Sequence, residues 1–158
     1  MEYVHAVYCN SHLPLSPVIR MVTNGRWSHV ALMSDAGHVL EATGSHGVVE
    51  TPIEALIERS SEYCIVRRLV PDGTHAKLVA VGRTQLGKKY DWWGIFGLSL
   101  NRDWQNDENW WCSEYFAWMF HKVSVPLVRA SAVHRVTPED TWKLPWEVVY
   151  ASHGGIET

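Results

Sequence analysis

The chain has 158 residues, enough to bury one substantial hydrophobic core without cross-links, so we expect a single domain over residues 1–158. Its 14 basic and 17 acidic residues give a formal net charge of -3, which argues against nucleic acid or an anionic membrane as a partner. Nine tryptophans are more aromatic surface than one small core needs, and part of it is expected to line a cleft.

The first half of the chain predicts a strand, a helix and three short consecutive strands. The Tyr- and Val-rich segment 2–9 is typical of a strand, and Ser16-Pro17 marks the start of a helix that ends at Asn24-Gly25. Turn-forming residues at 34–37 and 43–47 separate the predicted strands 27–33, 38–42 and 48–51. These three strands are expected to form a small antiparallel meander.

The second half predicts mainly helices. Pro52 begins a short helix through Ile57, and the apolar segment 63–70 returns to a strand. Helical spacing covers 75–86 and 112–123, Thr137-Pro138 begins a short helix, and 148–150 is a candidate last strand. This order predicts an α+β fold, a mainly antiparallel sheet flanked by helices.

The three cysteines, Cys9, Cys64 and Cys112, are odd in number and lack metal or redox spacing, so all are predicted to be reduced thiols. Segment 1–9 lacks a basic start and a long apolar region, and no stretch approaches the ~18 apolar residues of a membrane span. We therefore expect a cytoplasmic protein with no export signal and no transmembrane segment.

Cys112 lies where a polar, aromatic loop turns into the helix 112–123. Free backbone N–H groups and the positive end of the helix dipole stabilise a thiolate there, and they suit the oxyanion of a tetrahedral intermediate. Because the thiolate is the nucleophilic form of cysteine, this position favours a nucleophile. The alternative is a buried cysteine that acts as a small hydrophobic residue.

His29 and Glu41 lie in neighbouring predicted strands. Alternation places His29 on one face with Ala31 and Met33, and a strand gives it the fixed reach of a general base. If Glu41 shares that face, its carboxylate can hydrogen-bond the imidazole and fix its tautomer. The alternatives are a packed or strand-edge histidine and an exposed strand glutamate.

The segments Ser28-His29-Val30, Glu41, 85–92 and 111–114 follow one another in an order that resembles a known family. They look like the circularly permuted branch of the NlpC-type papain-like hydrolases, and within it the YiiX-like proteins, relatives of the lecithin:retinol acyltransferase group. In the usual papain-like order the cysteine precedes the histidine, whereas in the permuted branch it comes late. The resemblance spans about residues 16–145.

This resemblance implies that Cys112 is the nucleophile, that His29 is the general base and acid, and that Glu41 orients His29. It implies attack on an amide or ester carbonyl, a thioester acyl-enzyme, and release to water by a peptidase or amidase or to another acceptor by an acyltransferase. Glu114, which belongs to the family-like Cys-Ser-Glu motif, is as consistent with a structural charge partner. A charged insertion at 101–109 and the lack of a secretion or lipoprotein signal depart from many relatives.

The same resemblance places Tyr90 and Trp92 near the cleft, where with Trp27 and Trp111 they would form apolar walls around the thiolate. Packing alone is the alternative role for each of the four. The expected substrate is a small peptide, a cell-wall-type peptide or a lipid acyl compound. The sequence does not fix the oligomeric state.

No cofactor is expected. The histidines are scattered without the spacing of a zinc site, and the segment 44–47 lacks the lysine and hydroxyl of a phosphate-binding loop. Two other functions stay open beside the enzyme. One is a module of the same fold that holds a lipid or peptide without turnover, and the other is a structural or assembly component whose aromatic surface is an interface.

Overall fold

One six-stranded sheet organises the computed structural model, which describes residues 1–12, 20–21, 24–90, 109–129, 133 and 135–152. The strand order is β4-β3-β2-β1-β5-β8, and every neighbouring pair is antiparallel. The strands are β1 (Glu2–Ser11), β2 (His29–Met33), β3 (His38–Thr43), β4 (Gly47–Pro52), β5 (Ser60–Val70) and β8 (Glu147–Ala151). The predicted α+β class and the meander β2–β3–β4 are confirmed.

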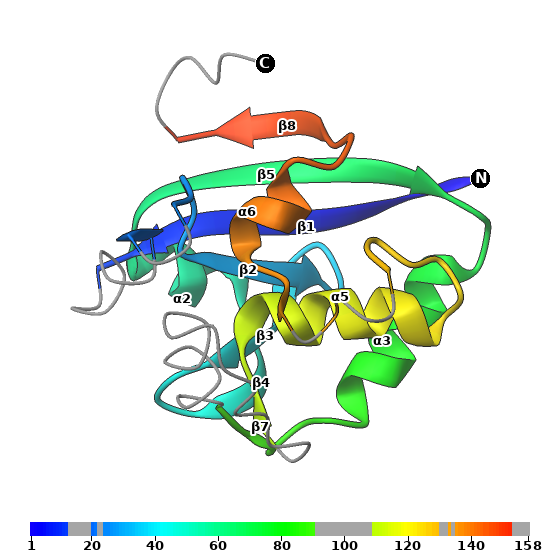
Figure 1. The fold of residues 1–158 in the computed structure, drawn as a ribbon, viewed down its shortest axis with the longest axis horizontal. Helices are drawn as coiled ribbons and strands as arrows, with labels where there is room; N and C mark the ends of the chain where they lie inside the picture. Colours follow the sequence, from blue (N-terminus) through cyan, green and yellow to red (C-terminus); the bar gives the residue numbers. More distant parts are fainter. Residues whose placement is uncertain (13–19, 22–23, 91–108, 130–132, 134, 153–158) are drawn as a thin grey trace.

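Helices flank this sheet, as Figure 1 shows. They are α2 (Ile53–Glu58), α3 (Thr74–Arg83), α5 (Cys112–Lys122) and α6 (Pro138–Trp142). Helix α5 packs on β2 and β3, and α3 packs against α5. Helix α6 begins at a capping box in which the Thr137 hydroxyl and the Asp140 carboxylate bind each other's backbone N–H groups, as the Thr137-Pro138 signature predicted.

Alternation along the strands divides the buried side chains between two faces. The face that α5 covers carries the larger cluster, with Val30, Leu32, Leu40 and Ala42 from the meander. The opposite face carries a smaller cluster that α2 completes; its members are Val7, Cys9, Ala31, Val39, Ile53 and Leu56. His29 and Glu41 share strand parity with Ala31 and Val39, so they belong to this second face.

Two short strands were not predicted from the sequence. Strands β6 (Lys89–Tyr90) and β7 (Asn109–Trp110) form a separate parallel pair that leads directly into α5. Of the predicted helix from Ser16 to Asn24-Gly25, residues 20–21 are helical and Asn24 lies in a turn, as predicted for the end of the helix, whereas residues 16–19 and 22–23 lie outside the described residues. Within the described part of the chain, no helix has the length and apolarity needed to span a membrane.

Candidate active site

Cys112 is the first residue of α5, and only 3% of its surface is exposed. Its Sγ atom lies 3.9 Å from the Ser28 carbonyl oxygen and accepts hydrogen bonds from the backbone N–H groups of Val30 and Ser113. The Ser113 N–H is one of the first-turn groups that an α-helix leaves without an intrahelical partner. The sulfur therefore lies between a helix N-terminus and the backbone of β2.

The sheet itself makes room for Cys112. Strand β1 pairs with β2 as far as His29, but the described pairs between β2 and β3 are Leu32 with Leu40 and Met33 with Val39. Toward His29 the two strands of the meander separate, although β3 continues to pair with β4. The thiol occupies this opening, where it contacts β2 backbone that a longer ladder would have paired with β3.

His29 lies between the thiol and a buried carboxylate. Its Nε2 atom is 2.6 Å from Glu41 Oε2, and its ring also hydrogen-bonds the Cys112 sulfur. Since Nε2 is engaged by Glu41, Nδ1 is the nitrogen that faces the sulfur. The structure thus brings together Cys112, His29 and Glu41, the three residues that the sequence singled out from distant segments.

Glu41 is fully buried and has three partners. Its Oε2 atom binds His29, its Oε1 atom accepts a 2.7 Å hydrogen bond from the Thr51 hydroxyl, and Arg59 Nη2 contacts both oxygens. Thr51 comes from β4, and Arg59 directly follows α2. Neither partner was predicted from the sequence, although a basic residue at the end of the helix that starts at Pro52 is the one signal that points to Arg59.

These contacts set the charge states of the site. Burial alone would raise the pKa of the Cys112 thiol, but the hydrogen bond and charge of His29 bring that pKa below its usual value. Burial would lower the pKa of His29, but hydrogen bonds to Cys112 and Glu41 hold it well above the usual value. Burial would raise the pKa of Glu41, but His29 and Arg59 lower it to about 2. All three directions favour a thiolate–imidazolium pair next to an ionised carboxylate.

Comparison with known proteins identifies the family. A family model described as a permuted papain-like amidase enzyme, YaeF/YiiX, C92 family, matches residues 7–153. The chain belongs to this family. Its permuted order is visible here, since the histidine strand β2 precedes the cysteine helix α5.

The C92 fold is also found among solved structures. The crystal structure of a protein described as metalloprotein yiiX from Escherichia coli O157:H7 superposes with a TM-score of 0.72 at 17% identity, covering 94% of this chain and 96% of that chain. The circularly permuted papain-like fold expected from the sequence is thereby confirmed. A search of curated proteins finds no match.

Because that structural neighbour is described as a metalloprotein, the donor groups of this chain bear on whether it could hold a metal. In the described part of this chain, no group of three or more His, Cys, Asp and Glu side chains is arranged to hold a metal ion. At the candidate site, both Glu41 oxygens are already bound by Arg59, and they also bind Thr51 and His29. A carboxylate neutralised by a guanidinium is a poor metal ligand, so this donor set does not fit a metal.

The four aromatic residues predicted to wall a cleft have different surroundings. Trp27 is fully buried and packs against the rings of Tyr8 and Trp142, with centroids 6.5 and 5.4 Å away. Trp111 is 4% exposed at the start of α5. These placements favour packing for both. Trp92 lies outside the described residues.

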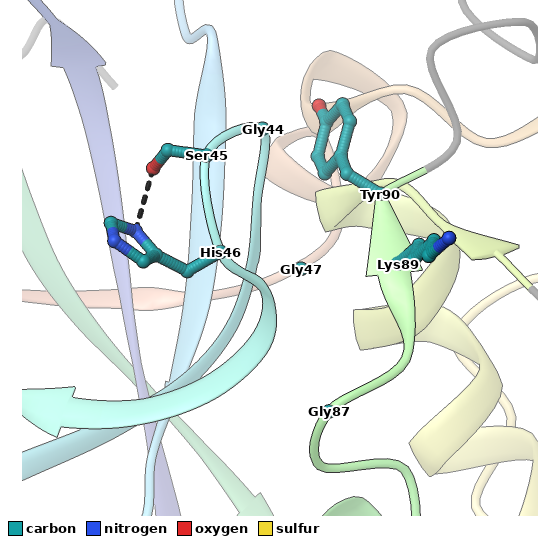
Figure 2. A pocket seen from close by; sticks show the side chains of 7 residues that line it. All are labelled: Gly44, Ser45, His46, Gly47, Gly87, Lys89 and Tyr90. Carbon is teal, nitrogen blue, oxygen red and sulfur yellow. Dashed lines mark hydrogen bonds between the residues drawn. The ribbon is translucent and has the colours of Figure 1, made fainter.

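Tyr90 lines a pocket of about 330 Å³. Figure 2 shows the Tyr90 ring on one side and the turn that joins β3 to β4 on the other. The lining residues are Gly44, Ser45, His46, Gly47, Gly87, Lys89 and Tyr90. Tyr90 pairs with Trp110, two residues before Cys112, and the turn follows the end of β3 that carries Glu41. The pocket therefore borders the elements that position the site.

Proposed function

We propose that this protein is a cysteine amidase that cleaves an amide bond of a small peptide or lipid amide through a thioester on Cys112. The observation that carries the proposal is the continuous chain of contacts from the Cys112 sulfur through His29 to the Glu41 carboxylate. Membership in an amidase family supports the choice of an amide over other substrates.

In the first half-reaction, the Cys112 thiolate attacks the substrate carbonyl carbon and forms a C–S bond. His29, protonated at the nitrogen that faces the sulfur, gives that proton to the leaving nitrogen as the C–N bond breaks. Glu41 keeps the ring oriented and stabilises its positive charge. The products are an amine and an acyl group held as a thioester on Cys112.

In the second half-reaction, neutral His29 takes a proton from water, and the water oxygen attacks the thioester carbonyl. The C–S bond breaks, the carboxylic acid leaves, and Cys112 returns to a thiolate beside protonated His29. The backbone N–H groups at the start of α5 are the proposed donors to the oxyanion in both steps.

The Tyr90 pocket is the proposed binding place for the substrate group next to the amide. Its volume of about 330 Å³ is at the small end of ligand pockets, which suits one side chain or a short acyl group. The phenol ring supplies an apolar wall, and the facing wall is the turn at residues 44–47, whose Ser45 and His46 side chains hydrogen-bond each other at 2.7 Å and point away from Tyr90 (Figure 2).

The test is trapping of the acyl-enzyme. The protein is mixed with a panel of chromogenic peptide and fatty-acyl amides, and intact mass spectrometry follows an acyl adduct whose site is mapped by peptide digestion. We expect the adduct on Cys112, its loss in Cys112→Ser, and a fall in its rate of at least about 100-fold in His29→Ala. Cys64→Ala, which removes a thiol on β5, is the control that should keep the adduct.

Two results would contradict the proposal. One is the absence of any adduct on Cys112 although a panel compound binds and is recovered unchanged, which favours a binding module. The other is turnover that continues at the wild-type rate in Cys112→Ser.

A further inference from the structure

We propose that Arg59 is a positioning residue of this site, which fixes the Glu41 carboxylate against His29 and balances its buried charge. This inference rests on the proposed function, because it concerns how the thiolate–imidazolium pair is formed. Neither the fold nor the family description assigns a role to Arg59.

The geometry gives the guanidinium a defined position. Arg59 Nη2 contacts both oxygens of Glu41, while the Thr51 hydroxyl binds the oxygen that does not face His29. With three partners, the carboxylate cannot rotate away from the imidazole without losing a contact. Fixing the acceptor in this way fixes the ring plane of His29 and the direction of its other nitrogen.

The second part of the argument is charge. When the site is activated, the thiolate and the carboxylate are negative, and the imidazolium and the guanidinium are positive, so the four charges sum to zero. Buried charge is costly unless it is paired and hydrogen-bonded. Without Arg59, the activated site would carry a net negative charge around a carboxylate with no exposure to water.

Besides the four charged groups, the titratable side chain that faces His29 from the neighbouring strand is Cys9. Cys9 comes from β1 opposite His29, and burial raises its pKa, so it adds no charge to the group. The backbone of Arg59 makes its own hydrogen bonds: its N–H donates to the Ile57 carbonyl, and its carbonyl accepts from the His12 N–H. A side-chain substitution therefore tests the guanidinium and leaves these backbone hydrogen bonds in place.

The experiment measures the rate of Cys112 alkylation by iodoacetamide against pH, with the labelled site identified by mass spectrometry. Deleting a positive charge raises the pKa of every acid near it, here Cys112 and His29. In Arg59→Gln, the rises and falls in the curve of alkylation rate against pH should therefore move to higher pH by about half a unit or more. Arg59→Lys restores the charge and should return the curve toward wild type.

Arg83→Gln is the matched control. Arg83 also makes a two-point contact with a glutamate, at 2.9 and 2.8 Å to Glu50, but this pair is on the surface and outside the site. Its removal should leave the alkylation profile unchanged. A purely structural role for Arg59 would lower the melting temperature of Arg59→Gln and leave the curve of alkylation rate against pH in place, which would overturn the inference.

A second comparison keeps the test decisive if Arg59→Gln does not fold. In Glu41→Gln the guanidinium stays beside His29 without its carboxylate, and the double variant Glu41→Gln/Arg59→Gln removes that unbalanced charge. In the double variant, Cys112 alkylation should rise at higher pH than in Glu41→Gln. Identical curves of alkylation rate against pH for these two variants would overturn the inference. If instead His29→Ala leaves the wild-type profile unchanged, it is the proposed function that fails.

Discussion

Glu41 has the surroundings least expected of a carboxylate, because it is wholly buried and still ionised. Its pKa lies at about 2 in the folded protein against an ordinary value of 4.5, a depression that contributes about 3 kcal/mol of stability at neutral pH. Because the folded pKa is the lower one, this contribution is complete above about pH 4.5 and declines as the pH falls toward 2. His29, whose pKa is raised, stays protonated throughout that window.

Urea unfolding at a series of pH values checks this contribution. The gap in unfolding free energy between the wild type and Glu41→Gln should be about 3 kcal/mol at pH 6 and should narrow to about half near pH 3. Glu54→Gln, at an exposed position of α2, is the control and should show a small gap. A Glu41→Gln gap that stays constant over this range would contradict the assignment.

Among the site residues, the sequence predicted those whose place in a helix or strand is unusual for their residue type, and it missed those whose place is ordinary. The start of a helix marks Cys112, and a polar residue in an apolar strand marks His29 and Glu41. The only mark of Arg59 is its place at the end of a short helix, which is not specific, because a basic residue there is ordinarily a surface residue. Its role depends on where α2 returns to the sheet, which spacing along the chain does not encode.

Among the elements, the turn from β3 to β4 depends on Gly47. Its φ of +70° is in the left-handed region, and a Cβ atom there would lie 2.0 Å from the Lys88 carbonyl oxygen. That carbonyl accepts the Val48 N–H at 2.8 Å, so the backbone after Gly87 is fixed against the start of β4. Glycine is the residue that permits this close approach beside the Tyr90 pocket.

Gly47→Ala is therefore expected to destabilise the protein by about 2 to 4 kcal/mol, from strained backbone together with a backbone clash. Gly87→Ala is the matched control, since its φ is +86° but nothing lies within 4 Å of the added Cβ. It should cost about 1 kcal/mol. Urea unfolding measures both, and equal losses would show that contact with Lys88 does not matter.

Element prediction succeeded where the chain has periodicity and failed where elements are very short. Helices α2, α5 and α6 were predicted from proline, capping and apolar spacing, and β2, β3 and β4 from turn residues between apolar segments. Strands β6 and β7 have two residues each, too few for any alternation. Their pairing depends on tertiary contacts that bring residues 20 positions apart side by side.

Across the whole molecule, an aromatic cluster joins the C-terminal segment to the central strands. The Trp142 ring of α6 lies 5.1 Å from the Tyr8 ring of β1 and 5.4 Å from the Trp27 ring, which precedes β2. Edge-to-face contacts of this kind add to the gain from burial. Trp27, which was predicted to line a cleft, is therefore part of the core.

Trp142→Ala should lower the free energy of unfolding by about 2 to 4 kcal/mol, because it removes a packed ring from that cluster. Val149→Ala, at a 51% exposed position of β8, should change it by less than about 0.5 kcal/mol. We also expect Trp142→Ala to keep the wild-type pH profile of Cys112 alkylation at 25 °C, since the ring contacts described for Trp142 are with the apolar rings of Tyr8 and Trp27. A shifted profile would show that α6 positions the site directly.

The position of β1 in the sheet has a consequence for synthesis. Strand β1 precedes the other strands of the sheet in the chain and becomes an interior strand, and β2, β3, β4 and β5 each add beside a strand already made. The helix that bears the sulfur emerges only after these five strands. A nascent chain therefore holds its imidazole, its carboxylate and the thiols of Cys9 and Cys64 well before it holds Cys112, and translation products that stop short of α5 lack the proposed nucleophile.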